Sequence, residues 1–364
     1  MEPASPRSVL TVDSTLQRSS TAEGTRPRGG GGIRGRQGLF GWLFITPAVA
    51  ILLIFLVIPI GLAFYVSLTK WDGLSSPFGS GAKFVGFDNY KNLLTQDSLT
   101  RQNFATSVRN NFYFVAIVVP AQTTLALAMA VLLNNKYLKG KSFFRTAFYF
   151  PSVTSSIAIT LVFLFLFSGT GAVNSLLNLI GIKGPNWLAD SGGLLHNVLA
   201  LFGANSAPSW AQYVVFNLSL WEWLSGPSVA MTVIIILVVW TTSGTFMLLF
   251  IAALQNIGEE IDEASELDGA SPWQRFRYVT LPMLRPTMLL VLTLGLIGTW
   301  QVFDQIYLTG NNPATVTPAY LSYSQSFSNS AFGVGAAIAF LLFALIIVLS
   351  LLQRRLVGGG ESDS

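Results

Sequence analysis

The chain has 364 residues, of which 51% are hydrophobic and only 10% are charged, and its formal net charge is +4. Soluble domains carry roughly 25% charged residues, so a chain of this composition cannot cover a water-exposed surface and is expected to reside in lipid. It contains no cysteine, which excludes a disulfide framework and thiolate metal sites.

The N-terminal segment, residues 1–38, is rich in Ser, Thr, Gly, Pro and Arg and has few large apolar side chains. Such a segment cannot bury enough surface to offset its ordering entropy, so we expect it to be disordered. No aromatic residues interleave with its arginines. This favours a cytoplasmic anchor beside a membrane span over nucleic-acid binding.

Six long apolar runs follow, and each approaches or exceeds the roughly 20 residues that a helix needs to cross the hydrocarbon core. They cover residues 42–68, 112–133, 148–168, 228–254, 287–308 and 333–352. The first run is longer than a signal-peptide core of about 7–15 residues, which indicates an uncleaved signal anchor. The sequence therefore predicts an all-α, polytopic membrane protein. Six transmembrane helices occupy residues 39–355, and a short cytoplasmic tail follows at 356–364.

Basic residues assign the two sides of the membrane. Four of them crowd residues 136–145 in the second connection, and three lie between residues 275 and 285 in the fourth. The third connection, residues 170–227, contains one basic residue, Lys183, and the fifth, residues 310–332, contains no Lys or Arg. The positive-inside rule therefore predicts that both termini and the fourth connection are cytoplasmic. The first connection argues weakly against this, because its five basic residues would be external.

The third connection is unusually long. Its apolar pieces at residues 194–203 and 213–224 are too short to cross a membrane, and several nearby tryptophans suit a membrane interface. We expect two helices on the external surface, which either touch a docked binding protein or act as a spacer. His196 has no companion ligand and is expected to be structural.

The fourth connection, residues 256–286, is the only densely charged segment among the apolar runs. Apolar residues at 257, 261, 264 and 267 share one side of a helix, and acidic residues recur at helical spacing on another. Gly269 then interrupts the helix. The segment Ser271-Pro272-Trp273-Gln274 supplies an N-cap, a first-turn proline and a capping-box glutamine for a second helix. By pattern alone, an elbow between two helices and an ordinary interfacial loop are equally open.

One string in this connection resembles the EAA signature of permease subunits from binding-protein-dependent ABC importers. It reads Glu263-Ala264-Ser265, three residues, Gly269, nine residues, Val279, one residue, Leu281-Pro282. With Asp268, Ala270 and Phe276 included, it is similar to the sugar-importer branch, which contains maltose and glycerol-phosphate permeases. The resemblance extends from about Leu39 to Arg355. The stretch 189–226 is the main departure from the family pattern.

The resemblance implies the type I permease fold of ABC importers and a coupling helix within residues 256–286 that inserts into a cleft on the ATPase. It assigns ATPase coupling to Glu263, Ala264, Ser265, Asp268, Gly269, Ala270, Leu281 and Pro282. It also implies four partners: a cytoplasmic ATP-binding-cassette dimer, a second homologous permease, an extracytoplasmic solute-binding lipoprotein and a sugar. ATP and Mg would bind to the ATPase, and this chain would hold no cofactor. The resemblance also places the chain in the bacterial inner membrane.

No enzymatic site is predicted. Gly140-Lys141-Ser142 resembles the end of a P-loop, but Asn135 stands where that pattern requires glycine, and no strand precedes it. The sequence shows neither metal-ligand spacing nor a nucleophile elbow. We therefore expect a non-catalytic subunit whose energy comes from a partner.

Polar residues inside spans are costly and tend to face a cavity, so they are candidates for the substrate path. By analogy with maltose-type permeases, the path is assigned to Thr241, Thr242, Thr245, Trp300, Gln301, Phe303 and Asp304. The alternative is that the hydroxyls bond their own helix backbone and that Asp304 pins two helices together. A site in the second permease stays open as well.

An ion-coupled secondary carrier is the alternative function. Such carriers commonly show inverted repeats and buried charges, and the sequence shows no convincing repeat and no paired intramembrane charges. The sequence does not distinguish a monosaccharide, disaccharide, oligosaccharide or glycerol phosphate as the cargo.

Overall fold

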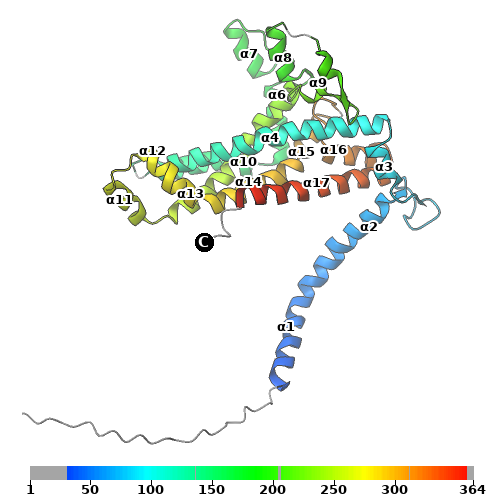
Figure 1. The fold of residues 1–364 in the computed structure, drawn as a ribbon, viewed down its shortest axis with the longest axis horizontal. Helices are drawn as coiled ribbons and strands as arrows, with labels where there is room; N and C mark the ends of the chain where they lie inside the picture. Colours follow the sequence, from blue (N-terminus) through cyan, green and yellow to red (C-terminus); the bar gives the residue numbers. More distant parts are fainter. Residues whose placement is uncertain (1–30, 136, 204–205, 311, 359–364) are drawn as a thin grey trace, which may run out of the picture. The chain divides into compact units, whose positions relative to one another are not determined.

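The computed structural model describes residues 31–135, 137–203, 206–310 and 312–358. These residues are predominantly helical, as Figure 1 shows. The chain divides into two compact units, Met1–Pro59 and Ile60–Ser364.

The first unit contains α1 (Gly31–Leu52), the π-helical turn η1 (Leu53–Val57) and the first residues of α2 (Ile58–Ser67). Its side chains from Phe40 onward are apolar and mostly exposed, as expected for a helix that faces lipid or another subunit. Residues 31–38, within the segment that the sequence predicts to be disordered, form the first turns of α1. The rest of that predicted segment, residues 1–30, lies outside the described residues.

The second unit holds the other elements. In chain order they are β1 (Thr69–Lys70), β2 (Lys83–Phe84), α3 (Asp88–Leu94), α4 (Leu99–Asn134), α5 (Lys141–Val153), α6 (Ser156–Leu166), α7 (Ala172–Leu179), α8 (Leu194–Leu201), η2 (Ser209–Gln212), β3 (Val214–Val215), β4 (Leu218–Ser219), α9 (Leu220–Trp223), α10 (Val229–Gln255), α11 (Glu259–Leu267), α12 (Pro272–Arg275), η3 (Phe276–Thr280), α13 (Leu281–Met283), α14 (Arg285–Trp300), α15 (Asp304–Leu308), α16 (Pro318–Tyr323), η4 (Ser324–Ser328) and α17 (Phe332–Gly358). The strands pair antiparallel, β1 with β2 and β3 with β4.

Among the described residues, five helices are long and apolar enough to cross a membrane. They are Phe40–Ser67, Leu99–Asn134, Val229–Gln255, Arg285–Leu308 and Phe332–Leu356. The remaining predicted span, at residues 148–168, is not one straight helix, because α5 and α6 meet at a bend of 95°. Pro151 cannot donate a backbone hydrogen bond, and Thr154 leaves the helical region with ψ 148°. The described residues therefore contain five helices that are long and apolar enough to span a membrane, or six if the bent pair counts as one span.

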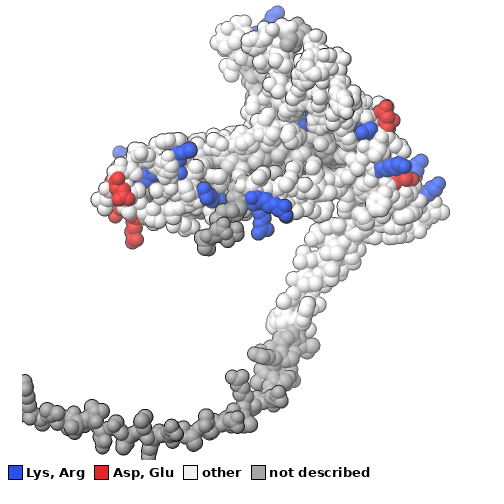
Figure 2. Space-filling model, in the orientation of Figure 1, with Lys and Arg blue, Asp and Glu red and all other residues white. Residues whose placement is uncertain are grey.

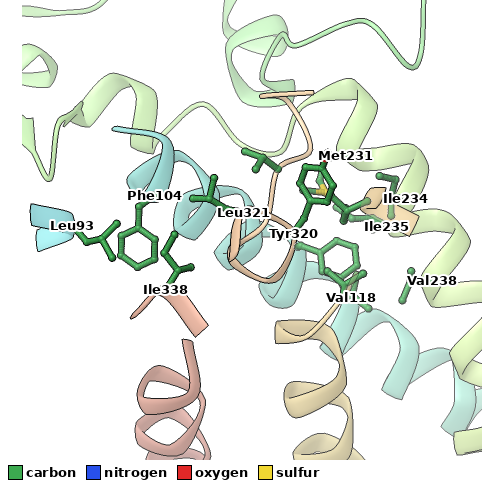
Figure 3. Close-up of a cluster of buried hydrophobic side chains, with 14 of the residues drawn as sticks. Leu93, Phe104, Val118, Met231, Ile234, Ile235, Val238, Tyr320, Leu321 and Ile338 are labelled. Atoms are coloured by element: carbon green, nitrogen blue, oxygen red, sulfur yellow. The ribbon is translucent and has the colours of Figure 1, made fainter. Parts of the chain in front are cut away.

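The core joins helices that are distant in the sequence. Helices α4 and α10 pack along one another, α14 packs against α4, and α17 packs against α14 and α16 (Figure 1). The largest buried cluster brings Val118 of α4, Met231 and Ile234 of α10 and Tyr320 of α16 together, as Figure 3 shows. A buried amide also links α4 to α14, because the side chain of Asn111 donates a 3.0 Å hydrogen bond to the carbonyl of Trp300.

The long third connection is only partly as predicted. Its first apolar piece forms α8, so a helix lies where one was predicted, and Figure 1 shows α7, α8 and α9 gathered beyond the end of α6. The second piece is instead the β3–β4 hairpin followed by the single turn α9. Phe216 and Asn217 form the turn with φ values of 53° and 60°, the left-handed pair that a tight hairpin requires. The Arg101 guanidinium lies 5.2 Å from the Phe216 ring centroid.

Candidate functional site

The charged connection forms an elbow between two helices at one end of the helix bundle. Figure 2 shows its acidic side chains gathered over α11, with Lys and Arg on the neighbouring surface. Helix α11 ends in a Schellman motif. The Ala270 N–H donates to the Ser265 carbonyl at 3.1 Å and the Gly269 N–H to the Glu266 carbonyl at 3.0 Å. Gly269 adopts φ +74°, which a residue without Cβ reaches at no steric cost.

The second half of the elbow begins as the sequence predicts. The Ser271 side chain accepts from the Gln274 N–H, the Gln274 side chain accepts from the Ser271 N–H, and Pro272 occupies the first turn of α12. An ion pair then joins the two halves, because Arg275 Nη1 lies 2.5 Å from Glu266 Oε1. The elbow is thus held by backbone caps on both sides and by one charged contact across it.

The residues assigned to ATPase coupling share this elbow. Glu263, Ala264, Asp268 and Gly269 are exposed, Ala270 is half-buried and Ser265 is buried at 9% exposure. Leu281 and Pro282 are half-buried in α13, at the start of the return into the bundle.

The apolar side of the elbow faces outward. Leu267 is 89% exposed and Trp273 is 67% exposed, so these side chains are free to contact another protein. Ile257 and buried Leu284, which flank the elbow, pack into the cluster formed by α4, α10 and α14. The side chains of Glu259 and Asp262, predicted for the acidic face, lie outside the described residues.

Two cavities adjoin one another inside the bundle. The first has a volume of about 290 Å³ and is lined by residues of α4, α10, α14 and α15. The second has a volume of about 310 Å³ and is lined by residues of α5, α6 and α10. Both are lined by Thr242, Phe246 and Gln305, so they form one recess beside the break between α5 and α6.

The recess includes most of the residues predicted for the substrate path. Thr242, Gln301, Phe303 and Asp304 line the first cavity, and Thr241, Thr242 and Thr245 line the second. Trp300 is the exception, because its side chain is 2% exposed and packs with Val115 and Leu342 in a separate buried cluster. Helix α14 ends at Trp300, and the ring points into the bundle core rather than into the recess.

Hydroxyl groups in the recess also bond to their own helix. Thr241 Oγ1 lies 3.0 Å from the Leu237 carbonyl, which is the backbone bonding that the alternative interpretation predicts. Thr242 Oγ1 lies 2.7 Å from the Val238 carbonyl and 2.6 Å from Gln122 Oε1. Thr242 therefore joins α10 to α4 while it lines both cavities.

Two glutamines in the recess are not among the residues assigned to the substrate path. Gln122 on α4 is 1% exposed and reaches Thr242, and Gln305 Nε2 donates to Ser156 Oγ at 3.1 Å, which joins α15 to α6. Gly295 makes room for Gln122, because a Cβ there would lie 2.5 Å from Gln122 Nε2. The sequence signal for Gln122 is a polar side chain in the middle of an apolar run.

Within the ranges that the structure describes, no three His, Cys, Asp or Glu side chains come together as metal ligands. His196 stacks on Trp221, with 4.2 Å between ring centroids and 16° between ring planes. This packing fits the structural role expected for it.

The family described as "Binding-protein-dependent transport system inner membrane component" matches residues 122–358. The lactose transport system permease protein LacF of Rhizobium radiobacter is 31% identical, with 86% of this chain and 92% of that protein covered. The multiple sugar-binding transport system permease protein MsmF of Streptococcus mutans is 32% identical, with 87% and 94% covered. A crystal structure of a bacterial ABC transporter involved in alginate import superposes with a TM-score of 0.67 at 19% identity, with 90% of this chain and 98% of that chain covered.

Proposed function

Because this chain belongs to the family of binding-protein-dependent transport system inner membrane components, we propose that it imports a sugar or a short oligosaccharide. As a family member it is a multi-pass permease of the inner membrane, and it is the non-catalytic membrane subunit of an ABC system that depends on a binding protein. The cofactor of such a system belongs to its ATPase.

The names of the relatives support a carbohydrate as cargo. They include permeases for lactose, for arabinooligosaccharides and for starch degradation products, and several cover nearly the whole chain. The chemistry of the recess agrees with this. Thr242, Gln301, Asp304 and Gln305 offer neutral and acidic hydrogen-bonding groups, and Phe303 offers an apolar face, which together suit a ring that carries hydroxyls.

Sugar uptake by a deletion strain tests the proposal. The strain is complemented with the wild-type gene, and uptake of radiolabelled lactose, arabinotriose, maltotriose and glycerol phosphate is measured. We expect ATP-dependent uptake of at least one carbohydrate. Uptake of amino acids or peptides by the complemented strain, with none of any carbohydrate, would contradict the proposal.

The elbow is proposed as the contact with a cytoplasmic ATP-binding-cassette dimer. Its exposed apolar residues Leu267 and Trp273 supply area for burial, and the acidic face around Glu263 supplies charge complementarity for basic residues. Residues Ser265, Asp268, Gly269 and Ala270 shape the bend itself. Closure of the ATPase dimer would move this elbow, and through Leu281 and Pro282 it would move α14 relative to α10.

A second homologous permease and an extracytoplasmic solute-binding lipoprotein complete the proposed assembly. The recess lies between α6, α10 and α15 and is not fully enclosed by this chain, which is consistent with a cavity that a second permease closes. Alternating access would then present the recess to the outside and to the cytoplasm in turn. An ion-coupled carrier would instead lose uptake when the ion gradient is collapsed at constant ATP, and this measurement separates the two mechanisms.

A further inference from the structure

Aromatic side chains continue the wall of the recess away from the cavity. Phe303, which lines the first cavity, stacks with Tyr307 at 5.6 Å between ring centroids and meets Tyr323 edge-on at 5.3 Å. Tyr323 lies 4.9 Å from the Phe327 ring. These four residues are named here the aromatic strip. Phe303 is the N-cap of α15, Tyr307 lies in α15, Tyr323 ends α16 and Phe327 lies in η4, so two separate segments build one surface.

The aromatic strip differs from an ordinary aromatic core because two of its rings are exposed. Phe327 is 64% exposed and Tyr307 is 48% exposed, whereas Phe303 and Tyr323 are half-buried. Tyr320, which contacts three of the rings, is only 8% exposed and belongs to the buried cluster of Figure 3. Tyr320 and the buried cluster around it therefore hold the rings of the strip in place, while the rings of Tyr307 and Phe327 stay exposed.

The chemistry of the strip fits a sugar ring better than it fits lipid. Tyrosine presents an apolar ring and a polar tip, and a pyranose presents an apolar C–H face bordered by hydroxyls. The hydroxyls of Tyr307 and Tyr323 can each donate to or accept from a sugar hydroxyl. The pKa of Tyr323 is raised from its ordinary value, chiefly by its interaction with Tyr307. Ser328 and Asn329, which follow Phe327 directly, are exposed and add further polar groups beside the outermost ring.

We propose that the aromatic strip is a carbohydrate-binding surface on which the outer rings of an oligosaccharide stack while its leading ring lies in the recess. The proposal rests on the proposed function, because it takes its ligand to be the same carbohydrate. Since Phe303 belongs to both the strip and the cavity, an oligosaccharide would occupy both at once. The strip therefore favours longer substrates.

Removal of single rings tests this in the complete importer, expressed in the deletion strain. Phe327→Leu and Tyr307→Leu remove a ring but keep an apolar side chain, whereas Phe327→Trp and Tyr307→Phe keep a ring. Uptake kinetics are measured with radiolabelled arabinotriose and arabinose, and membrane levels by immunoblot. We expect each leucine variant to raise KM for the trisaccharide about two- to tenfold, the range that one stacked ring contributes, with little change in the maximal rate. The ring-retaining variants should keep the wild-type KM for the trisaccharide, and no variant should change KM for arabinose.

A control variant separates stacking from general packing. Phe64→Leu removes an exposed ring whose edge-to-face partner is Phe340, outside the strip, and it should leave KM unchanged. Equal KM values for leucine and tryptophan at position 327 would overturn the inference, as would leucine variants that lower only the amount of protein in the membrane. If the wild-type importer carries no carbohydrate at all, the proposed function fails. If it carries the trisaccharide and the leucine variants keep its KM, only the strip fails.

Discussion

At the scale of single residues, the elbow depends on the left-handed backbone of Gly269. No heavy atom lies within 4 Å of the position of a Cβ there, so a side chain would fit, but at φ +74° it would be strained by about 1–2 kcal/mol. We expect Gly269→Val to reach the membrane at normal levels and to lose most transport-coupled ATP hydrolysis. Gly269→Asn should retain coupling, because asparagine tolerates this conformation.

The matched control is Gly310, which has φ +73° and equally open surroundings but lies in the fifth connection. Gly310→Val carries the same backbone strain outside the elbow and should leave the ratio of ATP hydrolysis to uptake unchanged. ATPase activity and sugar uptake are measured in proteoliposomes that contain the full importer. Normal coupling in Gly269→Val would show that the elbow does not transmit motion.

The Glu266–Arg275 ion pair permits a second prediction at this scale. Glu266 is 64% exposed at its side chain, and such surface pairs contribute only about 0.2–1 kcal/mol, so its loss should not change the melting temperature measurably. If the pair holds the elbow at its working angle, Arg275→Glu should reduce ATPase stimulation by the loaded binding protein. The double reversal Glu266→Arg with Arg275→Glu should restore it. Failure of the reversal to restore stimulation, with normal assembly, would exclude this role.

Residues of the elbow could be predicted from the sequence because all of its signals are local. The glycine break, the capping box around Ser271 and the amphipathic spacing lie within a few turns of one another. The recess is different. Gln122 and Gly295 are far apart in the chain, and only the packing of α4 against α14 brings them together. Trp300 shows that closeness in the sequence does not ensure a shared site. Its sequence neighbours Thr299 and Gln301 line the recess, while its own ring packs in the core.

At the scale of elements, the contact between α4 and α14 depends on Gly295. Gly295→Ala would place a methyl group 2.5 Å from Gln122 Nε2 and 3.7 Å from Phe246 Cε2, so Gln122 must leave its position beside Thr242. Overpacking of this kind costs about 1–3 kcal/mol, and we expect a lower melting temperature in detergent. Gln122→Ala in the same chain should recover part of the loss, because it removes the group that clashes.

Gly298→Ala is the control on the same helix, one turn further along. Nothing lies within 4 Å of a Cβ at that position, and alanine is a better helix former than glycine, so the melting temperature should hold or rise slightly. A fall as large as that of Gly295→Ala would mean that α14 tolerates no alanine at all, and it would remove the role assigned to Gln122.

Elements were predicted well where hydropathy alone decides them and poorly where the backbone changes direction. Helices α10 and α17 begin within a residue of their predicted starts, because polar or glycine-rich residues directly precede each apolar run. The break between α5 and α6 was missed because the prediction treats residues 148–168 as one apolar run, although Pro151 and the Ser and Thr residues at 152–156 mark the bend. The β3–β4 hairpin was missed because Phe216 and Asn217 lack the glycine that usually marks such a turn.

At the scale of the whole molecule, the positive-inside prediction places the elbow in the cytoplasm and the α7 to α9 region outside. The natural chain has no cysteine, so single cysteines report sidedness without a background. Glu263→Cys in α11 and Leu201→Cys at the end of α8 both replace exposed side chains, and Leu201 is 84% exposed. In spheroplasts, whose inner membrane is intact, a membrane-impermeant maleimide should label Leu201→Cys and not Glu263→Cys. In inverted vesicles the pattern should reverse. Labelling of Glu263→Cys from outside would place the elbow where no ATPase could reach it, and the proposed mechanism of coupling would then fail even though the chain retains its fold.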